Sequence, residues 1–229
     1  MINILILAGG FGTRLLKVVK DIPKPMAPVN NQPFLEHQLK LIKKSLTDYH
    51  VYVLTHHKSE IIERFVDNMS NVSVIKESKP LGTGGAIKHA LHKISDNKSK
   101  ILILNGDSYV DTDFDKFIKE SKGDINILCC KKDNCDRFAT VEIKNNIVCR
   151  FNEKKSNVKN SYISAGYYYV KNTKFLDMIN EDVFMIESIF ENICQNNMIY
   201  GYISNDIFLI LEFLRIIKVF VSIWKMNNI

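Results

Sequence analysis

Residues 2–15 read INILILAGGFGTRL, an aliphatic run that ends at two consecutive glycines. Branched aliphatic side chains at nearly every position of residues 2–7 are typical of a strand that is buried on both faces. The glycines that follow allow the backbone to approach an anion closely, because no side chain blocks the way and successive N–H groups can point at one charge. This stretch therefore predicts a buried strand that runs directly into a phosphate-binding loop.

The pattern of strand followed by helix repeats through the first half of the chain. Further strands are expected at 51–54, 72–75 and 100–104, separated by helices at 33–46, 60–69 and 86–94. Such alternation predicts parallel βαβ units, in which ligands bind at the carboxyl ends of the strands. Beyond residue 111 the pattern loosens, with strands expected at 125–130, 140–143, 147–151 and 167–170, helices at 175–179 and 184–194, and a hairpin turn at 145–146. We therefore expect an α/β protein with a mixed, mainly parallel sheet flanked by helices.

The composition predicts a cytoplasmic protein without a nucleic-acid partner. The 229 residues carry 31 basic and 25 acidic side chains, a net charge of +6, and the lysines are scattered rather than gathered with aromatic residues. That pattern argues against binding of DNA or RNA. The five cysteines form no C-x-x-C pair, which favours reduced, buried thiols over a disulfide framework or a zinc site. The apolar run at residues 1–8 is too short for a signal peptide.

A short basic motif follows the glycine loop. The segment Pro23-Lys24-Pro25-Met26 places a lysine in a stiff stretch ten residues after Arg14. Arg14 can meet phosphate oxygens with its fork of N–H donors, and Lys24 can supply a second positive charge. The loop is neither a dinucleotide fingerprint nor a P-loop, because Leu15 stands where G-x-G-x-x-G needs its last glycine and no G-K-[ST] sequence is present.

Together these motifs resemble the signature of the sugar-1-phosphate nucleotidyltransferases. GGFGTRL at 9–15 and PKPMAPV at 23–29 are similar to the family's G-G-x-G-T-R-L…P-K-P-x-x-P-V, and DIPKPMAPVNNQPFLE at 21–36 resembles the D-glycero-α-D-manno-heptose 1-phosphate guanylyltransferase branch. The resemblance covers about residues 1–206 and implies a Rossmann-like, GT-A-like nucleotidyltransferase fold. It also implies transfer of a nucleoside monophosphate, GMP from GTP in this branch, to a sugar 1-phosphate with release of pyrophosphate. The product would be a nucleotide-sugar for surface polysaccharide, and a homo-oligomer is left open.

The resemblance assigns a nucleotide site and a metal ligand. The nucleobase loop corresponds to ESKPLGTGGA at 77–86, where backbone amides and a threonine hydroxyl would read the base, and NGD at 105–107 corresponds to the family's metal-binding G-D. Asp107 would hold Mg²⁺ between phosphates, since hard carboxylate and phosphate oxygens suit that ion. The implied catalytic residues are Arg14, Lys24 and Asp107. The implied nucleotide-binding residues are Leu7, Ala8, Gly9, Gly10, Gly12, Thr13, Arg14, Lys24, Pro80, Gly82, Thr83 and Gly85.

Three weaker matches imply the sugar-phosphate site. FNEK at 151–154 resembles F-x-E-K, in which Glu153 would accept sugar hydroxyls and Lys154 would meet the sugar phosphate. SAGY at 164–167 resembles N-A-G-x-Y, with serine where asparagine is usual, and RFA at 137–139 stands where the family has R-Y-G. The implied sugar-phosphate residues are Ala139, Glu153, Lys154, Ala165 and Gly166. The extra methyl group of Ala139 puts the backbone contact at that position in doubt.

Residues 207–229 do not resemble the family's end, which carries a second metal-binding aspartate in a stretch like F-x-D-I-G-I-P-E-D-Y. Here 208–218 reads FLILEFLRIIK. Permitted codons for these residues, read after dropping the first two bases, encode F-D-I-G-I-P-E-D-Y-K. We therefore expect a nucleotidyltransferase domain at 1–206 followed at 207–229 by an atypical apolar tail that a change of reading frame has produced.

Three alternatives stay open from the sequence. Residues 207–224 are long enough to span a bilayer, but Glu212, Arg215 and Lys218 would each cost roughly 2.5–3.5 kcal/mol near its centre. We therefore expect no membrane span, although a helix lying on a membrane surface fits the spacing. The altered tail also motivates a catalytically impaired, nucleotide-binding homologue. Finally, Asp111-Thr112-Asp113 is a D-x-D pair of the kind that metal-dependent glycosyltransferases use, or else the cap of the next helix.

Overall fold

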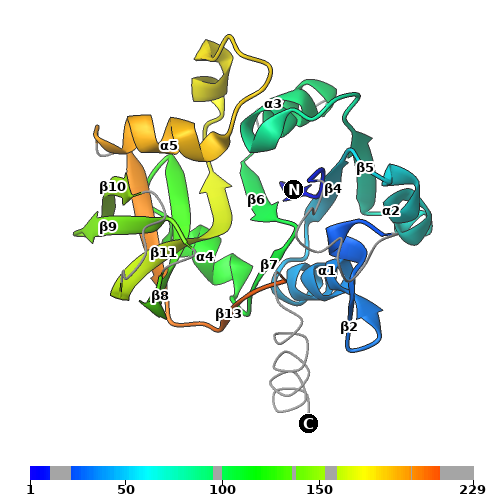
Figure 1. Cartoon of the computed structure of the whole chain (residues 1–229), viewed down its shortest axis with the longest axis horizontal. Helices are drawn as coiled ribbons and strands as arrows, with labels where there is room; N and C mark the ends of the chain where they lie inside the picture. Colours follow the sequence, from blue (N-terminus) through cyan, green and yellow to red (C-terminus); the bar gives the residue numbers. More distant parts are fainter. Residues whose placement is uncertain (11–21, 95–99, 136–137, 153–158, 197, 212–229) are drawn as a thin grey trace.

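The computed structural model describes residues 1–10, 22–94, 100–135, 138–152, 159–196 and 198–211. A nine-stranded mixed sheet forms its centre, in the order β5-β4-β1-β6-β11-β8-β12-β10-β9 (Figure 1). The strands of its first half are β1 (Ile2–Leu7), β4 (Tyr49–Thr55), β5 (Val72–Lys76) and β6 (Ile101–Asn105). All neighbours among these four pair in parallel, which confirms the predicted parallel core.

The second half of the sheet is mixed. The long strand β11 lies antiparallel between β6 and β8, and β12 pairs with β8 in parallel. An antiparallel hairpin of β9 and β10 follows β12, and β9 also pairs antiparallel with β11. The turn residues Asn145 and Asn146 both have positive φ, as an asparagine hairpin turn requires. The bounds are β8 (Ile125–Asn134), β9 (Thr140–Lys144), β10 (Ile147–Asn152), β11 (Lys159–Val170) and β12 (Ile199–Ser204).

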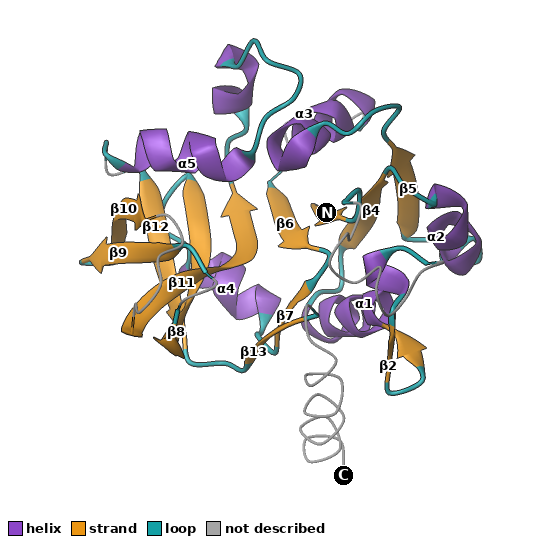
Figure 2. Cartoon of the chain, in the orientation of Figure 1, coloured by secondary structure: helices purple, strands orange, loops and turns teal. Residues whose placement is uncertain are grey.

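Helices cover both faces of the sheet (Figure 2). The helices α1 (Phe34–Ser45), α2 (Ser59–Val66) and α4 (Phe114–Glu120) pack on one face, and α3 (Gly82–Lys93) and α5 (Ile186–Cys194) pack on the other. In β1, Ile4 and Ile6 belong to the first core and Leu5 to the second, and all three are fully buried. The strand is therefore buried on both faces, as its aliphatic run predicts.

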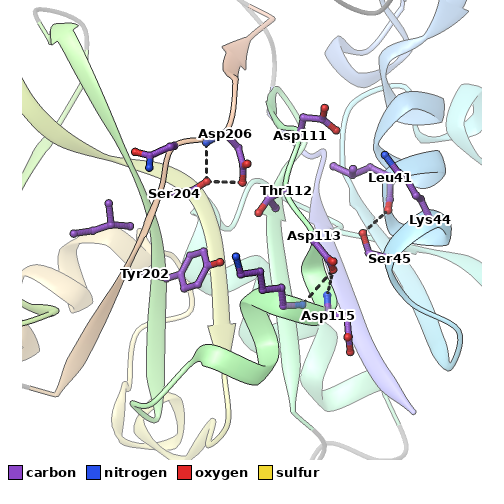
Figure 3. Close-up of a pocket in the computed structure, with 13 residues that line it drawn as sticks. Leu41, Lys44, Ser45, Asp111, Thr112, Asp113, Asp115, Tyr202, Ser204 and Asp206 are labelled. Carbon is purple, nitrogen blue, oxygen red and sulfur yellow. Dashed lines mark hydrogen bonds between the residues drawn. The ribbon is translucent and has the colours of Figure 1, made fainter. Parts of the chain in front are cut away.

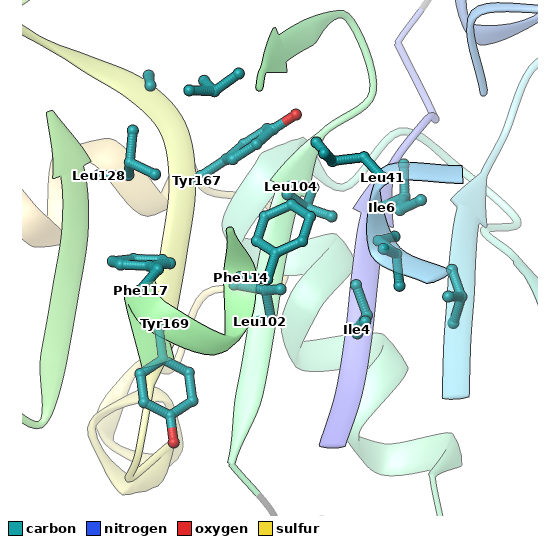
Figure 4. Close-up of a cluster of buried hydrophobic side chains, with 14 of the residues drawn as sticks. Ile4, Ile6, Leu41, Leu102, Leu104, Phe114, Phe117, Leu128, Tyr167 and Tyr169 are labelled. Carbon is teal, nitrogen blue, oxygen red and sulfur yellow. The ribbon is translucent and has the colours of Figure 1, made fainter. Parts of the chain in front are cut away.

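Aromatic side chains fill the core beneath α4. Figure 4 shows Phe114 and Phe117 of α4 lying over Tyr167 and Tyr169 of β11, with ring centroids 5.7 Å apart for Phe114 and Tyr167. Asp113 caps the helix by accepting hydrogen bonds from the amides of Asp115 and Lys116. The cap interpretation of the D-x-D pair is thus confirmed for its second aspartate.

Several expected elements differ in extent. The helix expected at 175–179 is a 3₁₀ turn, η2 (Lys174–Met178), and the strand expected at 167–170 begins eight residues earlier, at Lys159. The remaining short elements are η1 (Lys24–Met26), β2 (Pro28–Val29), β3 (Gln32–Pro33), β7 (Ser108–Val110) and β13 (Phe208–Ile210). All five cysteines are free, and four are buried, in agreement with the expected reduced thiols.

The first residues of the predicted tail pack with the rest of the fold. Strand β13 pairs antiparallel with β7, so that Ile210 lies opposite Ser108, and Leu211 is buried. The Leu211 amide donates a hydrogen bond to the Asp107 carbonyl at 2.8 Å. Residues 208–211 therefore continue the structure that the sequence places at 1–206, while 212–229 lie outside the described residues.

Candidate functional site

A pocket of about 450 Å³ opens at the carboxyl ends of β1 and β6, where the parallel βαβ units predict a ligand. Its walls come from the loop after β1, the turn after β6, the beginning of α3 and the beginning of α5. The lining residues are Leu7, Ala8, Gly9, Gly10, Lys24, Pro25, Glu77, Pro80, Leu81, Gly82, Thr83, Ala86, Asn105, Gly106, Asp107, Met185 and Glu187.

The turn that carries Asp107 is held from three sides. The Gln38 side chain of α1 donates to the carbonyls of both Asn105 and Ser108 at 2.9 Å, and the Tyr167 hydroxyl of β11 donates to Ser108 at 3.0 Å. The Gly106 amide donates to the Leu7 carbonyl at 3.0 Å, and a Cβ at residue 106 would lie only 2.5 Å from that oxygen. Glycine therefore lets the β6 turn pack directly against the end of β1.

Two of the predicted catalytic side chains form an ion pair. The Lys24 ammonium lies 2.7 Å from the Asp107 carboxylate, and their side chains are 18% and 34% exposed. The pair brings a short motif near the N-terminus into contact with the turn after the fourth strand of the parallel core. Arg14, Gly12 and Thr13 lie outside the described residues, so their predicted roles stay predictions.

The predicted nucleobase loop is held by hydrogen bonds to residues just before α5 and in its first turn. The Gly84 and Gly85 amides donate to the Phe184 carbonyl at 3.0 and 3.3 Å. The Thr83 hydroxyl donates to the Glu187 carboxylate at 2.7 Å and accepts from the Ile186 amide at 2.9 Å. In the structure these groups hold the loop against α5, and reading of a base by Thr83 or Gly85 stays a prediction.

Glu77 fixes the other end of the same loop. It is buried, its carboxylate accepts from the Leu81 amide at 3.1 Å, and one of its oxygens packs against Gly9. Burial raises the pKa of this carboxyl group, an effect that the hydrogen bond from Leu81 only partly offsets. Glu77 therefore connects the glycine loop to the nucleobase loop.

The predicted sugar-phosphate residues are less completely placed. Ala165 and Gly166 lie in β11 and Ala139 directly precedes β9, but none of the three lines the pocket described above. Gly166 has a φ of +76°, and a Cβ there would lie 2.3 Å from the Asn105 side-chain nitrogen. Gly166 thus makes room for the Asn105 side chain. Glu153 and Lys154 lie outside the described residues.

Three polar lining residues were not predicted as site residues. Asn105 precedes the G-D motif and could have been found from it, and its side-chain oxygen is buried without a hydrogen-bond partner among the described residues. Glu77 begins the predicted nucleobase loop. Glu187 carries no sequence signal, because it is a single glutamate in a helix far along the chain.

The D-x-D aspartates line a different pocket, of about 620 Å³, between α1, α4 and the end of β12 (Figure 3). Asp111 and Asp113 are therefore separated from the pocket that holds Lys24 and Asp107. Within the described ranges no group of three His, Cys, Asp or Glu side chains is arranged to hold a metal ion. The glycosyltransferase interpretation, which needs the D-x-D pair at the nucleotide site, gains no support.

No helix within the described part of the chain combines the length and the apolar character needed to cross a membrane.

Known proteins are similar to this chain in sequence and in architecture. The Nucleotidyl transferase family profile matches residues 3–213. A D-glycero-α-D-manno-heptose 1-phosphate guanylyltransferase of Campylobacter jejuni is 34% identical over 190 residues, covering 82% of this chain and 84% of that protein. The enzyme of the same name from Aneurinibacillus thermoaerophilus is 31% identical over 212 residues, covering 90% of each.

A solved structure agrees with the sequence comparison. HddC from Yersinia pseudotuberculosis, complexed with GMP-PN, aligns with a TM-score of 0.82 at 28% identity, over 98% of this chain and 100% of that one. This likeness confirms the α/β fold expected from the sequence. The stretch that the family profile matches includes the glycine loop, the Lys24 motif and the Asp107 turn. The chain belongs to the nucleotidyl transferase family.

Proposed function

We propose that this protein transfers a nucleoside monophosphate from a nucleoside triphosphate to a sugar 1-phosphate and releases pyrophosphate. The observation that carries the proposal is that Gly9 and Gly10, Lys24 and Asp107 line one pocket at the carboxyl ends of β1 and β6. GTP and D-glycero-α-D-manno-heptose 1-phosphate are the proposed substrates, because relatives that cover most of the chain bear that activity in their names. The product would be a GDP-linked heptose for surface polysaccharide.

The reaction needs positioning and charge neutralisation more than covalent chemistry. An oxygen of the sugar phosphate attacks the α-phosphorus in line, a new P–O bond forms, and the bond to the β-phosphate oxygen breaks. The electron pair leaves with pyrophosphate. Lys24 would neutralise charge around the α-phosphorus, Arg14 would bind the leaving pyrophosphate, and Glu153 and Lys154 would hold the sugar phosphate.

Asp107 is suited to hold Mg²⁺ in this pocket. Its carboxylate is partly exposed, and Lys24 is the cation that contacts it in the structure. A single carboxylate is an incomplete ligand set, so phosphate oxygens of the substrate would supply further ligands, as is usual for Mg²⁺. When bound, the ion would offset the negative charge of the phosphates. Lys24 would contact phosphate in the substrate complex.

A screen for pyrophosphate release tests this proposal. The purified chain is incubated with Mg²⁺, each of four nucleoside triphosphates and a set of sugar 1-phosphates that includes the heptose. We expect release with GTP and the heptose phosphate, and a GDP-sugar of the corresponding mass. Release with another base or sugar would correct the substrate but keep the reaction, whereas binding without release in every combination would contradict it.

A catalytically impaired homologue is the second candidate, and the altered tail favours it. Such a protein would bind GTP through the pocket yet release no pyrophosphate, because the sequence lacks the family's second metal-binding aspartate. Calorimetric titration of GTP beside the release assay separates the two candidates.

A further inference from the structure

Glu187 lines the same pocket as Lys24 and belongs to the first turn of α5. Its carboxylate accepts the Thr83 hydroxyl at 2.7 Å, and the Thr83 oxygen is fixed in turn by the Ile186 amide at 2.9 Å. Glu187 therefore joins the beginning of α5 to the beginning of α3. Its charge also acts on the hydroxyl group of the fully buried Tyr168 in β11, whose pKa it raises.

The electrostatic effect on Tyr168 supports this placement. Burial raises the pKa of the Tyr168 hydroxyl, and the negative charge of Glu187 raises it further. The Ser164 hydroxyl, also in β11, donates to the Tyr168 hydroxyl at 3.4 Å.

A carboxylate on the wall of a pocket for a triphosphate repels phosphate. It can only accept hydrogen bonds, so the substrate groups that suit it are hydroxyl or N–H donors. Two oxygens offer about four acceptor positions, and the Thr83 hydroxyl uses one of them. Glu187 is half-buried at the pocket edge, which leaves acceptor positions open toward a bound substrate.

We propose that Glu187 binds substrate hydroxyl groups and, through Thr83, holds the nucleobase loop against α5. The proposal rests on the proposed function, which places a nucleotide and a sugar phosphate in this pocket. Two hydroxyl sources fit the chemistry, the ribose of the nucleotide and the ring of the sugar 1-phosphate. The Glu187 carboxylate would thus be a determinant of substrate binding that acts without touching the reacting phosphorus.

The variant Glu187→Gln tests the proposal with little disturbance of the fold. The amide oxygen can still accept the Thr83 hydroxyl, but the negative charge is removed. Glu191→Gln is the matched control, since Glu191 is exposed one turn further along α5. Glu187→Asp, which keeps the charge on a shorter arm, serves as a partial rescue. Thermal unfolding of all three variants verifies that each is folded.

Binding is measured by calorimetry with GTP and 2′-deoxy-GTP, and then with α-D-mannose 1-phosphate added to the GTP complex. If Glu187 binds the ribose, the Gln variant weakens GTP roughly tenfold or more, the scale of a hydrogen bond to a charged group, and affects 2′-deoxy-GTP much less. If it binds the sugar, GTP affinity is unchanged and the sugar phosphate weakens by a similar factor. Glu187→Asp should recover part of either loss, and Glu191→Gln should change neither.

Equal affinities of the wild-type chain and Glu187→Gln for all three ligands would overturn the proposal while leaving the proposed function intact. Equal losses in Glu187→Gln and Glu191→Gln would also overturn it, because they would indicate a general effect of helix charge. A wild-type chain that binds neither nucleotide would remove both the inference and the proposed function.

Discussion

Lys24 and Asp107 neutralise one another in a pocket that is expected to receive several phosphate charges. The Lys24 ammonium and the Asp107 carboxylate, a candidate metal ligand, lie 2.7 Å apart. Once this contact is broken, Lys24 is available to a phosphate of the substrate and Asp107 is available to a metal ion. The pair is partly exposed, and surface ion pairs contribute little to folding. Substitution of either residue should therefore affect turnover far more than stability.

Lys24→Ala should reduce turnover by roughly a hundredfold or more, the usual scale for removing one transition-state charge partner. Pyrophosphate release under saturating substrates measures this, and urea unfolding should show little change. Lys40→Ala is the matched control, because Lys40 forms an exposed ion pair with Glu36 outside the pocket. Near-normal release by Lys24→Ala would show that the phosphate site lies elsewhere. Arg14→Ala is expected to behave like Lys24→Ala.

Asp107→Asn should abolish the dependence of activity on Mg²⁺ in the accessible range, since an amide is a much poorer ligand than a carboxylate for this ion. The turn should keep its shape, because Gln38 and Tyr167 hold it through backbone carbonyls of its neighbours. A titration of activity against Mg²⁺ is the measurement, with Asp111→Asn as the control from the separate pocket. An unchanged curve for Asp107→Asn would redirect attention to Asp111 and Asp113.

At the level of elements, the sequence predicts the strands of the parallel core because each is a continuous aliphatic run between turn residues. The order of the later strands could not be predicted in this way. Strand β11 crosses antiparallel between β6 and β8, a pairing that depends on contacts between residues distant in sequence. Lys24 and Asp107 were predicted because each lies in a short motif that can be recognised in the sequence. Glu187 was missed because it lies in no motif, and only the tertiary fold brings α5 to the pocket.

Gly166 gives a stability prediction for this crossing strand. Alanine there would have to adopt a φ of +76° and would place its Cβ 2.3 Å from the Asn105 side chain. Left-handed backbone costs roughly 1–2 kcal/mol for alanine, and overpacking adds about 1–3 kcal/mol. The free energy of unfolding of Gly166→Ala, measured in urea, should fall by roughly 2–5 kcal/mol.

Gly10→Ala is the stability control for Gly166→Ala, because a Cβ at residue 10 meets no atom within 4 Å. Its unfolding free energy should change by no more than about 0.5 kcal/mol. If Gly166→Ala were as stable as Gly10→Ala, the tight packing of β11 against the Asp107 turn would be contradicted.

At the scale of the whole molecule, the end of the described chain returns to the turn that carries Asp107. Ile210 pairs with Ser108, and the Leu211 amide donates to the carbonyl of Asp107 itself. Residues 208–211 supply only aliphatic side chains and Phe208 at this place. A carboxylate introduced within a residue or two of Ile210 would therefore lie on the strand that pairs with the residues directly after Asp107, the place we propose for a second metal ligand.

The alternate reading of the same codons supplies such a carboxylate. We predict that the gene contains, just out of frame after Asp206, codons for a segment like F-D-I-G-I-P-E-D-Y-K, and sequencing of the locus decides this. Restoring that frame should lower the Mg²⁺ concentration needed for half-maximal activity and raise turnover, because two carboxylates fix the ion and its bridged phosphates better than one. Aggregation, followed by light scattering, should fall as the apolar segment 207–224 is replaced. Asp107→Asn in the restored chain is the control, since it should cancel the gain. An alternate frame that lacks this segment would contradict the hypothesis and make the apolar tail a genuine part of the protein.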